Sequence, residues 1–438
     1  MNKLVSRMEQ VVQSYVADKQ FMGSILVTQH GDILLDKGYG YANIEWQIQN
    51  SPTTKFRIAS LTKQFTAVAI LLLEEQDKLK ITDRLNKYMP DAPSAWRDVT
   101  IFHLLNHTSG IPNYTKFPDF SAFTTSTKTP EQQIAYFRDK ELNFKPGQDY
   151  EYNNSAYVLL GYLIEKLGGQ SYQDFIVEHI FKPNAMNDSG YDSHTEIILY
   201  RASGYVVTPN GFRNADYLDM SIPYSGGSLY STTHDLLRWE EQLFGGKILS
   251  SASLNKMITP YINNYGFGIM VQSVDAKQAI MHAGGTSGFS TFMLYSPKEQ
   301  LTVIILSNLN PLGFVVQDLA FKIATLAHGN AVTLPSERKK IIVSSKMLAK
   351  YVGTYNVNPY IGPYGPTSFK QIILTFENDN LMMHITNEPK IQLFPESETQ
   401  FFGKIPDVQL KFINNAPDNV SHLVLHQDGE DSTGIKIH

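Results

Sequence analysis

The clearest chemical signal in this sequence is a serine and a lysine three positions apart, Ser60 and Lys63. Ser-x-x-Lys also occurs at Ser253/Lys256 and Ser336/Lys339. Only Ser60 opens a long apolar stretch with helical spacing, residues 60–76. A helix N-terminus offers N–H groups and a partial positive charge, which suit an oxyanion. One turn along, a desolvated lysine can remove the serine proton, so the pattern predicts Ser60 as nucleophile and Lys63 as its base. Taken alone, an N-cap serine followed by a solvated lysine explains it more simply.

A second pattern, Tyr-x-Asn, is found at Tyr152 and Asn154, and it recurs at Tyr41/Asn43 and Tyr261/Asn263. Only the first copy follows a loop signal, Lys145-Pro146-Gly147, and precedes an apolar helical stretch. A tyrosine near cations can act as general acid or base, and an asparagine amide can bind both a substrate carbonyl and Lys63. The alternative is a turn tyrosine followed by an N-capping asparagine.

A third pattern, His282-Ala283-Gly284-Gly285, ends a predicted strand. Glycine in a strand allows a ligand to approach the backbone closely, which makes Gly284 a candidate substrate contact. The N–H groups of Ser60 and Gly285 can together form an oxyanion hole. A bulged strand with a structural histidine is an equally good explanation of this segment by itself.

The elements that must position these residues follow from hydrophobic periodicity. Helical spacing predicts helices over 4–16, 60–76, 157–167, 236–244 and 314–327. Short apolar runs between turn residues predict a hairpin over 23–40 and strands over 266–271, 279–282, 291–295 and 301–307. We therefore expect an α/β (α+β) domain, an antiparallel sheet flanked by helices with an all-helical insertion, and the site between sheet and insertion.

The last hundred residues have a different pattern. Residues 331–340 are polar and contain Pro335, which is typical of a linker. Short alternating apolar runs then predict strands over 351–355, 371–376, 381–385, 391–394, 409–412 and 422–425. Such a series predicts a small antiparallel β barrel. The expected domains are a hydrolase domain over 1–330, a linker over 331–340 and a barrel over 341–438.

Composition excludes several functional classes. The 438 residues carry a net charge of −5 and no long basic run, which argues against a nucleic-acid partner. The absence of cysteine excludes disulfides, thiolate metal sites and a cysteine nucleophile. His103 and His107 have helical metal-ligand spacing, but no third ligand accompanies them, so no metal and no cofactor are expected.

The sequence gives little information on location and assembly. No apolar run approaches the roughly 20 residues that span a bilayer, so no transmembrane segment is expected. Met1 to Lys19 lacks the continuous apolar region of a signal peptide. Localisation therefore stays open, and an extracytoplasmic location would require a signal that was removed. An oligomer is compatible with the sequence.

The three patterns occur in the order Ser-x-x-Lys, Tyr-x-Asn, His-x-Gly, and together they resemble the serine β-lactamase and penicillin-binding protein superfamily. The similarity is greatest to the branch of class C β-lactamases, DD-peptidases, D-aminopeptidases and related esterases. Further segments that match are 56–63, 103–110, 224–231 and 284–289, within an overall resemblance over about 23–327. The C-terminal region resembles the lipocalin-like domain of some members, with residues 351–355 as its opening.

The resemblance implies a role for each matching residue. Ser60 would form the acyl-enzyme, and Lys63 and Tyr152 would share proton transfer. Asn154 would orient substrate and lysine, and His282 would line the site opposite Tyr152. One departure stands out, because the third motif of typical members is Lys-Thr-Gly and this chain has His-Ala-Gly. A mostly neutral histidine and an alanine bind a substrate carboxylate less well.

We therefore expect a serine hydrolase that acts on peptides or esters, including compounds with D-amino acids and peptidoglycan-derived peptides. Two alternatives stay open at this point. One is a β-lactamase of the class C type, and the other is a non-catalytic protein that binds penicillin or peptidoglycan.

Overall fold

The computed structural model describes residues 3–208, 210–310, 315–357, 360–362, 365–367, 370–385, 390–404, 407–416, 419–427 and 430–437. Its contacts divide the chain into two compact units. The first unit comprises Met1–Phe21, Val274–Ala276 and Pro311–His438, and the second comprises Met22–Ser273 and Lys277–Asn310. No described helix has both the length and the apolar character needed to cross a membrane.

A six-stranded sheet forms the centre of the second unit, with the order β10-β11-β12-β13-β1-β2. Its strands are β1 (Gly23–Gln29), β2 (Asp32–Tyr39), β10 (Met270–Val274), β11 (Lys277–Thr286), β12 (Phe289–Ser296) and β13 (Leu301–Ser307). Strand β1 pairs with β2 and β13, and β12 pairs with β11 and β13, all antiparallel. The turn between β1 and β2 contains His30 and Gly31, both at positive φ, as a tight hairpin turn requires. Helix α8 (Thr233–Phe244) packs against β1 and β13.

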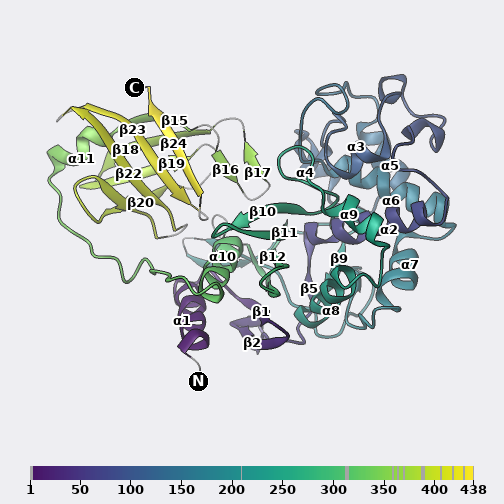
Figure 1. Cartoon of the computed structure of the whole chain (residues 1–438), viewed down its shortest axis with the longest axis horizontal. Coiled ribbons are helices and arrows are strands. Elements are labelled where there is room, and N and C mark those ends of the chain that lie inside the picture. Colours follow the sequence, from purple (N-terminus) through teal and green to yellow (C-terminus); the bar gives the residue numbers. More distant parts are fainter. Residues whose placement is uncertain are drawn as a thin grey trace. The chain divides into compact units, whose positions relative to one another are not determined.

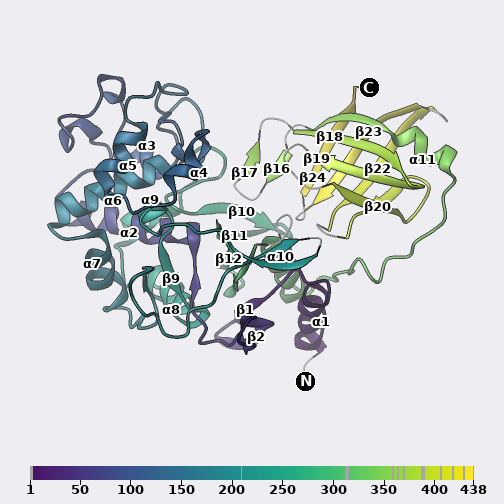
Figure 2. The same ribbon diagram turned by 180° about the vertical axis from the view of Figure 1, so that it is seen from behind.

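Helices form the second layer of this unit, and Figures 1 and 2 show α3, α5 and α6 gathered in one group. Residues 85–181, all of them described, contain helices and no strand. These are η2 (Leu85–Lys87), η3 (Ser94–Trp96), α3 (Ile101–Leu105), η4 (Tyr114–Lys116), α4 (Phe120–Phe123), α5 (Pro130–Phe137), α6 (Asn154–Gly168), α7 (Tyr172–Ile176) and the π-helix η5 (Val177–Phe181). Helix α6 begins where the Asn153 side chain accepts from Ala156 N–H, and it ends at Gly169 with φ 73°.

A small three-stranded sheet contains the strand that directly precedes the predicted nucleophile. Strand β5 (Phe56–Arg57) pairs with β9 (Leu229–Ser231), which also pairs with β6 (Gly190–Tyr191). A single 3-10 turn, η1 (Ala59–Leu61), then leads into helix α2 (Thr62–Glu75). Eleven of the fourteen residues of α2 are buried, so nearly every face of this helix contacts protein.

The remaining elements of this unit are short. They are β3 (Tyr41–Asn43), β4 (Ile48–Gln49), β7 (Tyr205–Thr208), β8 (Gly211–Asn214), η6 (Tyr224–Gly226), α9 (Ser251–Ile258) and β14 (Leu309–Asn310). Strands β6 to β9 follow the helical segment, and the sequence pattern did not indicate them.

The C-terminal region is a closed antiparallel barrel of eight strands, drawn in green to yellow in Figure 1. The strands are β15 (Gly353–Val357), β18 (Lys370–Glu377), β19 (Asn380–Ile385), β20 (Ile391–Pro395), β21 (Gln400–Phe402), β22 (Gln409–Ala416), β23 (Asn419–Gln427) and β24 (Glu430–Lys436). Pairing of β15 with β24, with Tyr355 opposite Lys436, closes it. A hairpin of β16 (Tyr360–Gly362) and β17 (Gly365–Thr367) accompanies it. The predicted barrel is thus confirmed.

Buried charges connect the helices and the barrel of the first unit. Helices α1 (Lys3–Ala17) and α10 (Val315–Ala327) pack together, and the Tyr15 hydroxyl donates to Asp318 at 2.5 Å. Lys322 on α10 forms ion pairs with Asp318 and, at 3.0 Å, with Asp407. The first unit therefore contains α1 and α10 together with the barrel. The expected boundary at residue 330 would instead assign both helices to the hydrolase domain. The expected boundaries stay a prediction.

The predicted sheet and flanking helices are confirmed, but two predicted strand starts are wrong. The strand expected from residue 266 begins at Met270, because the preceding residues turn back at Gly268, whose φ is 69°. The strand expected from Tyr351 begins at Gly353, because Tyr351 ends helix α11 (Ser345–Tyr351). Neither change moves a predicted site residue.

Helix α2 is held by an aromatic cluster, which yields a stability prediction. Phe65 stacks on Trp239 with ring centroids 4.1 Å apart and contacts Phe181 edge-on. Phe65→Ala should lower the free energy of unfolding by about 3–5 kcal/mol, because it leaves a cavity in a fully packed core. Guanidinium denaturation followed by tryptophan fluorescence measures this. The control Phe212→Ala, at a residue 37% exposed on β8, should change it by less than about 0.5 kcal/mol, and equal losses would contradict the assignment.

Candidate active site

The site is organised around the side-chain nitrogen of Lys63, which is completely buried. Lys63 Nζ lies 3.1 Å from Ser60 Oγ, 2.9 Å from Asn154 Oδ1 and 2.8 Å from the carbonyl oxygen of Gly226. These partners come from η1, the start of α6 and η6, so three segments distant in sequence meet at one amine.

No carboxylate is among these partners, and burial lowers the pKa of Lys63 to about 7. A neutral amine has two N–H donors and one lone pair. The carbonyl oxygens of Asn154 and Gly226 can only accept, so they take both hydrogens. The lone pair is then left for the hydroxyl proton of Ser60, which is the arrangement that a general base requires.

Ser60 lies in a strained turn that directly precedes the N-terminus of helix α2. The preceding residue, Ala59, has φ 47°, which is unusual for a residue with a Cβ. Ile58 is fixed on the other side, because its carbonyl oxygen accepts from Thr291 Oγ1 at 3.0 Å. Ser60 itself retains 9% exposure, whereas Lys63 has none. Ser60 thus keeps a small exposed surface, while the side chain of its predicted base stays out of water.

Strand β11 packs closely against this turn at Gly284. A Cβ on Gly284 would lie 2.5 Å from the Ile58 carbonyl oxygen and 3.2 Å from the Ser60 nitrogen, so only glycine fits there. Gly284 is buried and the following Gly285 is exposed. The predicted strand glycines therefore lie beside the predicted nucleophile, while their part in an oxyanion hole stays a prediction.

Tyr152 also lies close to the lysine, with its ring centroid 4.9 Å from Lys63 Nζ. Its position is fixed by the backbone around it. Its carbonyl oxygen accepts from Asn113 Nδ2 at 3.2 Å, and the N–H of Asn153 donates to His107 Nδ1 at 3.1 Å. The ring also contacts that of His107 at 4.5 Å. Because Asn153 caps α6, the second motif is a helix start, and Asn154 is the first residue of that helix.

The histidine pair at His103 and His107 has structural roles here. His103 Nδ1 accepts from Thr100 N–H in a capping box of α3. His107 is buried, and burial, together with nearby Lys63 and His282, lowers its pKa well below the usual range. Within the described part of the chain, no group of three metal-ligating side chains occurs.

His282 is buried at 0% exposure beside Tyr152, with ring centroids 6.1 Å apart. Its Nδ1 lies 2.5 Å from the Ala283 carbonyl oxygen, so Nδ1 carries the proton. Its Nε2 then accepts from the Tyr265 hydroxyl at 2.8 Å. Burial lowers the pKa of His282 to about 3, so the imidazole is neutral near pH 7. Its contact with substrate stays a prediction.

The structure thus brings together all seven predicted site residues, Ser60, Lys63, Tyr152, Asn154, His282, Gly284 and Gly285. Sequence reasoning missed two contributors, the carbonyl of Gly226 and the ring of His107. A backbone acceptor leaves no residue-type signal, and His107 was considered only as a metal ligand. The second Ser-x-x-Lys copy lies on α9, where Lys256 forms an ion pair with Glu74 at 2.9 Å.

Comparisons with known proteins show the family to which the chain is similar. The profile of the family described as Beta-lactamase matches residues 8–327, and that of a domain of unknown function, DUF3471, matches residues 337–435. Penicillin-binding protein 4* of Bacillus subtilis (strain 168) is 31% identical over 449 aligned residues, which cover 95% of each chain.

Solved structures extend the comparison. The octameric penicillin-binding protein homologue from Pyrococcus abyssi has a TM-score of 0.69 at 26% identity, covering 99% of this chain and 100% of that one. The D-amino acid amidase from Ochrobactrum anthropi SV3, complexed with L-phenylalanine amide, has a TM-score of 0.68 at 22% identity, covering 75% of this chain and 99% of that one. This second similarity shows the fold alone. Since the family profile covers well over half of its residues, this chain belongs to the beta-lactamase family of serine hydrolases.

Proposed function

We propose that this chain is a serine hydrolase that forms an acyl-enzyme at Ser60 and acts on peptides, amides or esters, including those of D-amino acids. One observation carries the proposal. The Ser60 hydroxyl lies 3.1 Å from a fully buried lysine amine whose other two contacts can only accept hydrogen bonds. A solvated structural lysine would not have this environment.

Acylation in this scheme begins with proton transfer from Ser60 Oγ to Lys63 Nζ. The oxygen attacks the substrate carbonyl carbon, and the carbonyl oxygen becomes an oxyanion. When the tetrahedral intermediate collapses, the bond to the leaving group breaks, and the leaving group receives, by way of Tyr152, the proton that Lys63 took from Ser60. Water then attacks the acyl-enzyme, releases the acid product and restores the Ser60 hydroxyl. The proton count closes with no group beyond substrate and water.

Tyr152 is the proposed proton carrier to the leaving group. Its ring lies next to the Lys63 amine, whose positive charge after it takes the serine proton favours transfer of the phenolic proton to the leaving group; Lys63 then restores that proton to Tyr152. Asn154 holds the amine in place and offers its amide N–H groups to a substrate carbonyl. The backbone N–H groups of Ser60 and Gly285 are proposed to receive the oxyanion, which is supported by the close approach of β11 at Gly284.

The substrate class is proposed from names and from charge. A relative is named a penicillin-binding protein, and a protein of the same fold is a D-amino acid amidase. The third motif of this chain has a neutral His282 and a buried Ala283, so it offers no cation to a carboxylate at neutral pH. This favours a peptidase, amidase or esterase over an efficient β-lactamase.

Ser60→Ala should abolish turnover of 4-nitrophenyl esters, a loss of about 10³-fold or more in kcat, because no nucleophile remains. The variant should also lose labelling by a fluorophosphonate probe, measured by intact-protein mass spectrometry, while its circular dichroism spectrum stays unchanged. Ser253→Ala, in the second Ser-x-x-Lys copy, is the matched control and should retain both. Labelling that persists in Ser60→Ala would place the nucleophile elsewhere.

The activity should depend on pH through Lys63. Only the neutral amine accepts the serine proton, so kcat/KM should rise with increasing pH through about 7, the pKa of this lysine. The two buried histidines have depressed pKa values and are already neutral there, so they cannot produce this limb. A pH profile of ester hydrolysis measures it. A rising limb with its midpoint below pH 5 would exclude Lys63 as the base.

Benzylpenicillin should acylate Ser60 slowly and leave a persistent adduct in intact-protein mass spectra, because the third motif lacks a cation for its carboxylate. Unmodified protein with rapidly hydrolysed penicillin would instead favour the class C-type β-lactamase. If neither penicillin nor a fluorophosphonate labels the protein and no ester is turned over, the non-catalytic binding protein is the better account.

A further inference from the structure

A cavity of about 580 Å³ lies in the second unit, and the proposed reaction does not use it. Its walls include Arg57, three residues before Ser60, and Ser287, two residues after Gly285. Three residues span at most about 11 Å of chain, so Arg57 is close to the nucleophile. The cavity is thus walled by the two chain segments that carry the serine and the strand glycines.

Two arginines reach into this cavity and share one carboxylate. The Arg57 Nε and an Arg201 terminal nitrogen each lie 2.7 Å from an oxygen of Asp192, whose side chain is completely buried. Arg201 also donates to the Ser193 carbonyl at 2.9 Å. Two guanidinium charges against one carboxylate leave an excess of one positive charge. Among the described residues, neither terminal nitrogen of Arg57 has a hydrogen-bond acceptor.

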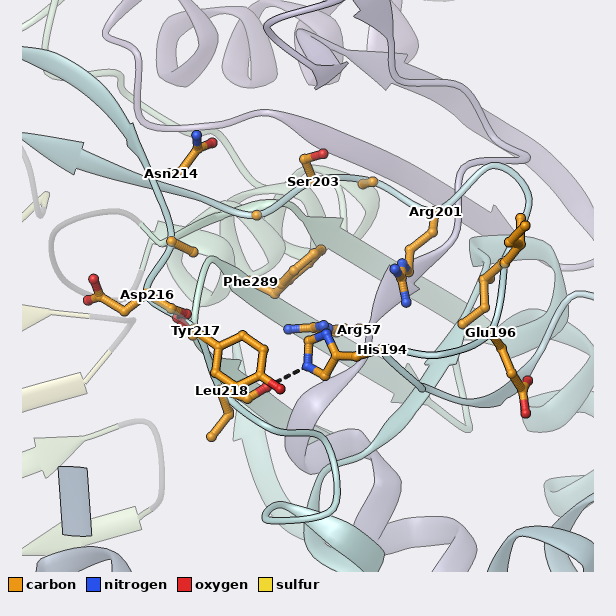
Figure 3. Close-up of a pocket in the computed structure, with 16 residues that line it drawn as sticks. Arg57, His194, Glu196, Arg201, Ser203, Asn214, Asp216, Tyr217, Leu218 and Phe289 are labelled. Atoms are coloured by element: carbon orange, nitrogen blue, oxygen red, sulfur yellow. Dashed lines mark hydrogen bonds between the residues drawn. The ribbon is translucent and has the colours of Figure 1, made fainter. Parts of the chain in front are cut away.

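The other acidic groups of the cavity do not cancel this charge locally. Asp216 is paired with Arg213 at 2.8 Å. Glu196 is exposed, and in Figure 3 its carboxylate points away from the two guanidinium groups. His194, which also faces the middle of the cavity in Figure 3, donates from Nε2 to the Leu218 carbonyl at 2.8 Å.

Arg57 is also held in place, which suits recognition. Its guanidinium lies 5.6 Å from the ring centroid of Phe289, and Asp192 fixes Nε, so the terminal nitrogens are pre-oriented as a planar fork. Such a fork matches a carboxylate in two parallel hydrogen bonds. Two apolar side chains lie at the exposed edge of the cavity among polar ones, since Ile197 is 92% exposed and Tyr217 is 56% exposed. A pair of arginines beside such apolar side chains fits an acidic group at the end of an apolar chain.

We propose that this cavity binds a carboxylate at the distal end of the substrate's acyl portion, through Arg57 and Arg201, and thereby selects acidic acyl groups. The inference rests on the proposed function, because it takes the acyl group to be attached to Ser60. It gives the enzyme a carboxylate site of its own, separate from the neutral third motif.

The test compares two esters of equal chain length, 4-nitrophenyl hexanoate and the mono-4-nitrophenyl ester of adipic acid. The readout is the ratio of kcat/KM for the acidic ester to that for the neutral one, with Ser60→Ala as the blank. Arg201→Gln should lower this ratio about tenfold or more, the usual effect of losing a charge-assisted hydrogen bond. Arg201→Lys, which keeps the charge, should restore part of it.

Arg238→Gln is the matched control, because Arg238 also pairs with a buried carboxylate, Asp235, but lies outside the cavity. It should leave the ratio unchanged. If Arg201→Gln does not fold, as judged by circular dichroism, Arg201→Lys carries the test and should lower the ratio less than tenfold but measurably. An unaltered ratio in the folded cavity variants overturns the proposal.

The outcome separates this proposal from the proposed function. If neither ester is hydrolysed faster than by Ser60→Ala, the serine hydrolase assignment fails. The cavity is then tested by calorimetric titration of the full chain with adipate alone. Binding that weakens about tenfold or more in Arg201→Gln supports a carboxylate site, and no binding, or equal binding by both proteins, overturns it.

Discussion

The withdrawal of one lysine amine from water is the condition on which the rest of the site depends. No carboxylate among the described residues pairs with Lys63, so burial lowers its pKa to about 7. The surrounding groups make this tolerable, because the Asn154 and Gly226 oxygens satisfy the two hydrogens of the neutral amine. A neighbouring aspartate would raise the pKa of Lys63 and keep its amine protonated, so the amine could not accept the serine proton. The chemistry therefore depends on the absence of a counter-ion as much as on the residues present.

Close backbone packing produces that environment. The η6 turn, which presents the Gly226 carbonyl, reaches the lysine because Gly161 on α6 leaves room for Ser225, whose hydroxyl would lie 2.1 Å from a Cβ there. Tyr224 in the same turn has φ 42°, a strained value for a tyrosine. Ala59 carries similar strain on the serine side. Strained turns that the surrounding core enforces are a known feature of sites with fixed geometry, because the core resists their relaxation.

Sequence patterns predicted the parts of this site that are local. Ser60 and Lys63 are one helical turn apart, so their proximity follows from periodicity. The helix after Tyr152 was also predicted, but it begins at Asn154, three residues before the expected residue 157, and its cap is Asn153. The lysine's other partners lie 91 and 163 residues away in sequence, and nothing local indicates that they meet. Gly268 shows the same limit. Its segment has the apolar character of a strand, but the chain turns there instead. The turn lies so close to α2 that a Cβ added to Gly268 would be 2.5 Å from the Lys63 carbonyl oxygen. Alternating runs predicted the barrel strands, whereas the closing pair of Tyr355 and Lys436 depends on the whole domain.

The central claim is that Lys63 loses its proton near neutral pH, and an NMR titration tests it directly. The protein is labelled with lysine carrying ¹³C at Cε, and the Lys63 signal is assigned by its loss in Lys63→Arg. The account predicts a titration midpoint at about 7. A midpoint near 10.5, the ordinary value for lysine, would show a permanently protonated ammonium and contradict Lys63 as the base that activates Ser60.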